Sequence, residues 1–223
     1  MKGVVFSFNK SHFGRRGIKR ITVSDIRYFF KRYGVRAMFV LLLFAGLATG
    51  SVYAENADTS MLESLDFLFT TNLDARLTQN FAGTFCACLA SDFIFLISVY
   101  LLGLAPWGIP FLPFVIFFKG FGTGLTAGYL FISESLAGIG FYLLILLPGT
   151  FLFCIALVLF SSSAFNFSKR MFICTASKEV PKQPLRTGAI AFSSRFMSSL
   201  IMTFSAAVLD TVLWTLFAGS FEF

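Results

Sequence analysis

The sequence predicts an all-α fold: a polytopic membrane protein with about five transmembrane helices, its N-terminus cytoplasmic and its C-terminus outside. The first observation is composition. Of the 223 residues, 57% are hydrophobic and only 13% are charged, and the mean hydropathy is +0.80. A soluble domain carries about a quarter charged residues, so much of this apolar surface must face lipid. The other two observations are five long apolar runs and an alternating charge pattern in the segments between them.

Five apolar runs have roughly the 20 residues that a helix needs to cross about 30 Å of hydrocarbon. They cover approximately residues 37–54, 81–104, 111–132, 136–160 and 188–218. The last run is longer than a bilayer requires, so its helix should continue beyond one membrane face. Residues 37–223 therefore form a single membrane domain, which follows a basic arm.

The charges predict how the chain is threaded. Residues 1–36 contain ten of the 18 Lys and Arg and one acid, and residues 161–188 contain five bases and one acid. Residues 55–80 contain five acids and one base. The positive-inside rule places both basic segments in the cytoplasm, with an inner turn at 105–110 and a tight outer turn at 133–135. Because the asymmetry indicates topology rather than a nucleic-acid surface, the expected partner is the lipid bilayer and not nucleic acid.

The basic cytoplasmic arm contains a predicted amphipathic helix that lies in the membrane interface. Ser24 is a good N-cap and Gly34 a good C-cap. Apolar residues between them fall at helical spacing and are separated by bases: Ile26, Phe29, Phe30 and Tyr33. A helix of this kind is attracted to anionic lipid.

The segment after the first run raises two further expectations. Ser60–Glu63 fits a capping box, so a short helix with an acidic face is expected on the outer surface. Val52–Ala54 resembles a signal-peptidase site. We favour an uncleaved first span because the charged region before it is long for a signal peptide. Cleavage would instead leave four spans and an N-terminus outside.

Ionisable residues fall inside three of the runs, where each costs about 2.5–3.5 kcal/mol. Asp92 and Lys119 lie on the two arms of the predicted hairpin, at depths that differ by about 5 Å. Lys119 could pair with Asp92 or with Asp210, or it could reach the inner headgroups. The sequence leaves these alternatives open, and it predicts that Arg195 reaches the inner headgroups.

The third run carries glycines at a spacing of four. Gly120, Gly124 and Gly128 share one helix face, and small residues let helix backbones approach closely in lipid. This stripe predicts a packing seam against another helix of this chain, of a second copy or of a partner. A broken helix lining a substrate cavity is the less common alternative.

The sequence predicts no enzyme and no cofactor. It contains no phosphate-binding loop and no metal-ligand cluster, and its single histidine, His12, lies in the basic arm. No Ser–His or Cys–His relay can therefore be assembled within the membrane.

The stretch "LLGLAPWGIPFLPFVIFFKGFGTGLTAGYL" resembles the stage II sporulation protein M family. The close resemblance covers roughly residues 78–132, and a lysine followed by glycine inside a transmembrane run makes it specific. The shared positions are Gly103, Gly108, Pro110, Lys119, Gly120, Gly124 and Gly128. The long basic arm and Asp92 have no counterpart in the family pattern.

This resemblance implies a scaffold with no catalytic role, and it gives the shared positions a structural and assembly role. Family members act in septal wall thinning and forespore engulfment during sporulation, in the mother-cell or septal membrane. They are thought to assemble with two peptidoglycan-cleaving enzymes, stage II sporulation proteins D and P. Such partners would be held through the glycine seam and the acidic outer segment. The alternative is a small transporter or permease subunit that uses Asp92, Lys119 and Asp210 as a buried polar path.

Overall fold

The computed structural model describes residues 23–55, 80–177 and 185–217. The chain divides into two units, Met1–Gly34 and Val35–Phe223. The predicted outer helix that begins at Ser60 lies outside the described residues.

The first unit is described only through the beginning of helix α1, which spans Val23–Ala54. The prediction that a separate helix ends at Gly34 is wrong, because helical backbone continues through this residue. One glycine inside a helix costs only about 1 kcal/mol. The apolar run that follows propagates the helix regardless.

The second unit contains the remainder of α1 and four further long helices. These are α4 (Phe81–Leu104), α5 (Phe111–Phe141), α6 (Leu147–Ser177) and α7 (Leu185–Phe217). Five helices are long and apolar enough to cross a membrane, and no strand occurs in the ranges that the structure covers. The predicted all-α fold with five spans is therefore confirmed.

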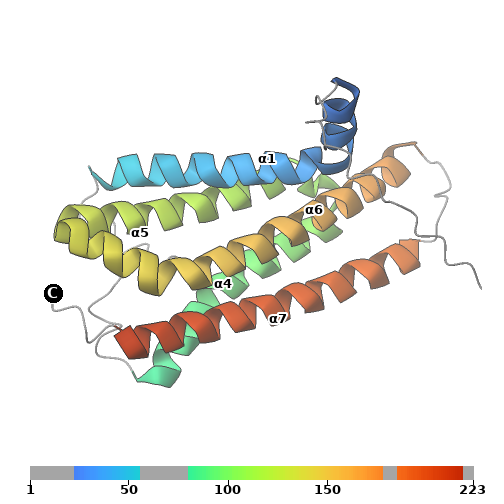
Figure 1. Ribbon diagram of the computed structural model, residues 1–223. Coiled ribbons are helices and arrows are strands. Elements are labelled where there is room, and N and C mark those ends of the chain that lie inside the picture. Colours follow the sequence, from blue (N-terminus) through green and yellow to red (C-terminus); the bar gives the residue numbers. More distant parts are fainter. Residues whose placement is uncertain (1–22, 56–79, 178–184, 218–223) are drawn as a thin grey trace, which may run out of the picture. The chain divides into compact units, whose positions relative to one another are not determined.

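Contacts between these helices show that their directions alternate along the chain (Figure 1). Phe85 near the start of α4 packs edge-on against Phe204 in the second half of α7. Tyr100 near the end of α4 stacks on Phe192 in the first half of α7. Helices α4 and α7 are therefore antiparallel. The sides of the membrane on which the two termini lie stay a prediction.

The predicted inner turn is a short 3-10 helix, η1 (Pro106–Gly108), joining α4 to α5. The amide of Gly108 donates to the carbonyl of Ala105 over 3.1 Å, and the Ser168 hydroxyl of α6 donates to the same oxygen over 2.7 Å. A Cβ on Gly108 would lie 2.6 Å from the carbonyl carbon of Leu102, which is too close for any side chain. The turn is thus closed by glycine and held by α6.

Two other motif positions flank this turn. A Cβ on Gly103 would lie 2.6 Å from the Phe192 ring and 2.9 Å from the Cβ of Ala164, so this glycine lets α4 approach α6 and α7. Pro110 directly precedes α5. A proline fits there because the first turn of a helix does not use its backbone N–H groups.

The chain reverses direction near the predicted outer turn at 133–135, since Thr126 of α5 and Tyr142 line the same cavity, but its backbone there is helical. Helix α5 includes these residues and continues to Phe141, and a π-helical turn (Tyr142–Leu146) then leads directly into α6. The physical reason is that Ser-Glu-Ser contains neither proline nor glycine, so nothing there breaks a helix. Helix α6 also extends past the predicted end at 160 to Ser177. The polar and basic residues that follow the apolar run are therefore part of the same helix.

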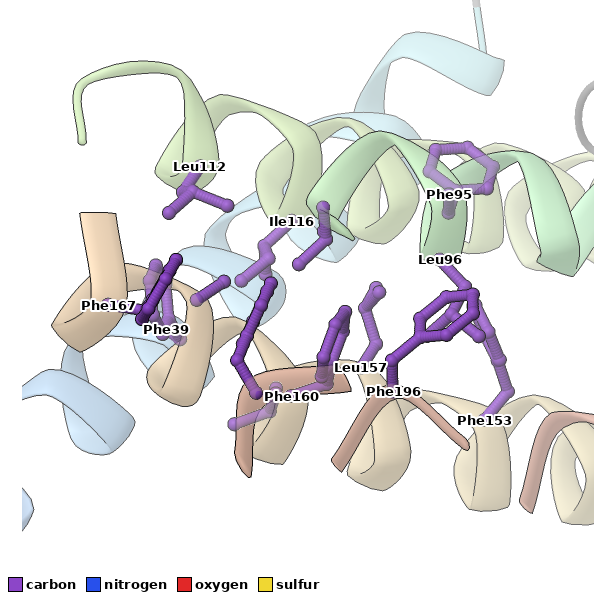
Figure 2. Packing of buried hydrophobic residues seen from close by; sticks show 14 of the residues in the cluster. Phe39, Phe95, Leu96, Leu112, Ile116, Phe153, Leu157, Phe160, Phe167 and Phe196 are labelled. Carbon is purple, nitrogen blue, oxygen red and sulfur yellow. The ribbon is translucent and has the colours of Figure 1, made fainter. Parts of the chain in front are cut away.

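The core of the second unit is rich in phenylalanine (Figure 2). Helix α6 contributes Phe153, Leu157 and Phe160, which are fully buried. Phe192 of α7 stacks on Phe160 and Phe167 with ring centroids 5.2 and 5.0 Å apart. Stacked and edge-on aromatic pairs add to the packing energy beyond the area that they bury. Helix α6 is therefore the central element against which the other helices pack.

Candidate functional site

Helices α1 and α5 approach so closely that only glycine fits between their backbones. A Cβ on Gly124 would lie 2.8 Å from the carbonyl carbon of Leu47, and one on Gly120 would lie 3.1 Å from that of Leu43. The carbonyl oxygens lie closer still. Because successive residues of α5 meet successive residues of α1, the two helices run in the same direction.

The same seam has a glycine stripe on α1. A Cβ on Gly46 would lie 2.9 Å from the amide nitrogen of Phe121, and one on Gly50 would lie 2.8 Å from that of Leu125. The Ser51 hydroxyl donates to the carbonyl of Gly124 over 3.1 Å. Two small-residue stripes thus interlock, the arrangement that favours close helix association in lipid. The partner of the predicted α5 seam is the first span of this same chain.

The opposite side of α5 carries a buried ion pair. Lys119 Nζ lies 2.8 Å from Asp92 Oδ1 of α4, and the two residues are only 5% and 9% exposed. The ammonium also lies 5.0 Å from the ring centroid of Phe95 and 4.9 Å from that of Phe153, two rings that Figure 2 labels in the core. Such rings attract cations through their faces. Of the alternatives that the sequence left open, the structure has the Asp92–Lys119 pair.

A small polar cavity of about 40 Å³ adjoins this pair. It is lined by residues from α4, α5, α6, α7 and the π-helical turn: Cys88, Ser91, Asp92, Lys119, Gly122, Thr123, Thr126, Tyr142, Leu146, Thr150 and Asp210. Asp210 has room there because its neighbour on α6 is Gly149, where a Cβ would lie 2.5 Å from the Asp210 carboxyl carbon. The three predicted polar residues therefore converge on one cavity.

The threonines that line the cavity use their hydroxyl protons within their own helices. Thr123 donates to the carbonyl of Gly120 over 2.8 Å, and Thr150 donates to that of Leu146 over 2.8 Å. Each hydroxyl oxygen then keeps only acceptor capacity. The cavity is large enough for water, and its acceptor oxygens, beside the Asp210 carboxyl and the Lys119 ammonium, suit water. In the part of the chain that the structure describes, no three His, Cys, Asp or Glu residues group as metal ligands.

Other features of the site were absent from the sequence prediction. The α1 stripe was readable as small residues at a spacing of four, in "AGLATGSVYA". Nothing in the sequence marked Gly149 as part of the site, because it makes room for Asp210, which lies opposite it only in the folded chain. Arg195, expected to reach the headgroups, has an exposed side chain that donates to the Ser163 hydroxyl of α6.

A family model for stage II sporulation protein M matches residues 38–214. The chain belongs to the stage II sporulation protein M family. The match covers most of the chain, including most of every predicted span, and leaves out the basic arm. Membership marks this chain as a multi-pass membrane protein of a sporulation family. Neither a curated protein nor a solved structure matches it.

Adding a methyl group within the seam should destabilise this family member. We expect Gly124→Ala to lower the free energy of unfolding by roughly 1–3 kcal/mol, the usual cost of overpacking, because the backbone of α1 must move away. The matched control is Gly188→Ala, whose Cβ would lie at an ordinary 3.4 Å from the Phe167 ring. Titration with dodecyl sulfate in mixed detergent micelles measures the free energy of unfolding of both variants. Equal stabilities for the two variants would contradict the seam.

Removing one member of the ion pair should cost more than removing both. Lys119→Met leaves buried carboxylates without their cation, a loss of about 3–5 kcal/mol. The double variant Lys119→Met, Asp92→Leu should recover part of this loss because it removes a desolvated charge as well. A double-mutant cycle from the same unfolding titration gives the coupling free energy. Additive losses would show that the pair contributes nothing.

Proposed function

We propose that this protein is an integral membrane scaffold for a peptidoglycan-hydrolase complex that thins the septal wall and allows forespore engulfment. Membership of the stage II sporulation protein M family is the observation that carries the proposal. The proposed partners are stage II sporulation proteins D and P, and the proposed location is the mother-cell or septal membrane. The protein itself is proposed to have no catalytic role.

The packing of the helices supports a structural role. Interlocked glycines fix α1 on α5, and aromatic contacts fix α4, α6 and α7 around an apolar core. A rigid assembly of this kind can hold other proteins at defined positions. Since α1 of the same chain fills the glycine seam, the partner contact is expected on a different surface.

Helix α7 offers such a surface. Large apolar side chains recur on it at intervals of three, four and seven residues and are exposed: Ile190, Met197, Ile201, Phe204, Val208, Val212 and Leu216. This spacing forms one continuous stripe along a helix. A single membrane-spanning anchor of a partner, or a second copy of this chain, could pack along it.

Co-purification from sporulating cells tests the scaffold. The wild-type chain should retain both peptidoglycan-cleaving partners, and Ile201→Trp should lower their recovery severalfold because the larger ring disrupts packing along α7. The control is Leu41→Trp on α1, since Leu41 and Ile201 are 69% and 68% exposed. If the wild-type chain retains no hydrolase from cells that are engulfing forespores, the scaffold proposal fails.

The polar cavity favours a second candidate, a transporter or permease subunit. Asp92, Lys119 and Asp210 line one cavity that carries acceptor oxygens, as a path for protons or small cations requires. We expect such a protein, reconstituted in vesicles, to carry a proton or sodium flux that Asp210→Asn abolishes. A fluorescent pH or sodium indicator inside the vesicles measures this flux. Equal leakage of protein-free and protein-containing vesicles would rule the candidate out.

A further inference from the structure

An apolar groove of about 480 Å³ runs between α1 and α6 in the second unit. Most of its lining is aliphatic or aromatic: Val40, Leu43, Phe44, Leu47, Leu147, Phe151, Ile155, Val158 and Leu159. Thr123, Tyr142 and Thr150 also line it and are shared with the polar cavity. The groove therefore suits an apolar chain, and these polar side chains lie where it meets the polar cavity.

The dimensions of the groove match one lipid tail. Its lining extends from Arg36 to Leu47 on α1 and from Leu147 to Leu159 on α6, which at 1.5 Å per residue is about 17–18 Å on either helix. Half of a bilayer's hydrocarbon core is about 15 Å thick.

The charge of the groove is confined to one end. Arg36 is the one charged residue among the described residues that line it, and its side chain is exposed. Phe39 of α1 packs edge-on against Phe165 of α6, so this part of α1 lies beside the later part of α6. Arg36 therefore lies at the Leu159 end of the groove. A guanidinium there offers a planar set of donors that binds phosphate oxygens in pairs.

We propose that this groove binds one acyl chain of an anionic phospholipid, with the lipid phosphate on Arg36. The groove is about one leaflet deep, and its single cation lies where a headgroup would be. The proposal is independent of the scaffold function.

Spin-labelled lipids test the headgroup contact. The full chain is reconstituted into vesicles of phosphatidylcholine that contain a trace of acyl-labelled phosphatidylglycerol or phosphatidylcholine. The fraction of motionally restricted label should favour phosphatidylglycerol, and Arg36→Gln should lower this preference about fivefold, the effect of one basic group at a membrane surface. Arg170→Gln, at an exposed base of α6 outside the groove, should leave it unchanged. An identical preference in the wild type and Arg36→Gln would overturn the proposal.

Filling the groove tests the acyl site separately. Val40→Trp places an indole in the groove and should reduce the restricted fraction for both lipids, whereas Val52→Trp, on an exposed part of α1 outside the groove, should not. The unfolding titration confirms that each variant is folded. A misfolded Val40→Trp is replaced by Leu159→Trp, which fills the groove from α6. If the folded variant keeps its restricted lipid but no longer retains partner proteins, the groove is a protein-binding surface and the lipid proposal is wrong.

Discussion

The backbone contact between α1 and α5 constrains the rest of the membrane unit. Without water to drive apolar surfaces together, helices in lipid associate through close packing and hydrogen bonds. The glycines of both stripes allow a contact in which carbonyl oxygens of one helix face the backbone of the other. Such contacts fix the rotation of α5 about its axis. That rotation decides which α5 side chains face α4 and α6.

Lys119 and Gly120 are neighbours in sequence, and neighbouring residues on a helix point about 100° apart. When Gly120 packs against Leu43 of α1, Lys119 must therefore point elsewhere, and it meets Asp92 of α4. The lysine-glycine pair thus joins two helix contacts at one level of the bundle. A buried ion pair gains little net stability because both ions lose their hydration. It fixes the register of α4 against α5, since a shifted register would leave two buried charges apart.

Much of this fold was readable from the sequence because hydropathy and helix breakers are local signals. The predicted range 81–104 coincides with α4, which ends where Ala105 and a proline-containing turn follow. The place where the chain reverses between α5 and α6 was readable, but its helical backbone was not, because a polar tripeptide without proline or glycine can be a turn or a helix. The choice of partner for Lys119 was equally undetermined. The depth difference of about 5 Å between Lys119 and Asp92 is within reach of the lysine side chain. Only the rotation of α5 about its axis decides which carboxylate Lys119 meets.

The positions that carry the sequence resemblance to the family have a structural interpretation one by one. At Gly103, Gly108, Gly120, Gly124 and Gly128 an added Cβ would meet another atom at 3.1 Å or less, so these residues act by having no side chain. Lys119 is the motif position that brings a charge into the core, and Asp92, which balances it, lies outside the motif. A motif made mainly of packing constraints is what a protein requires when its purpose is to hold helices at fixed positions. The small polar cavity is the feature that such a purpose does not need, and for this reason a flux measurement discriminates between the two candidate functions better than any further examination of the seam.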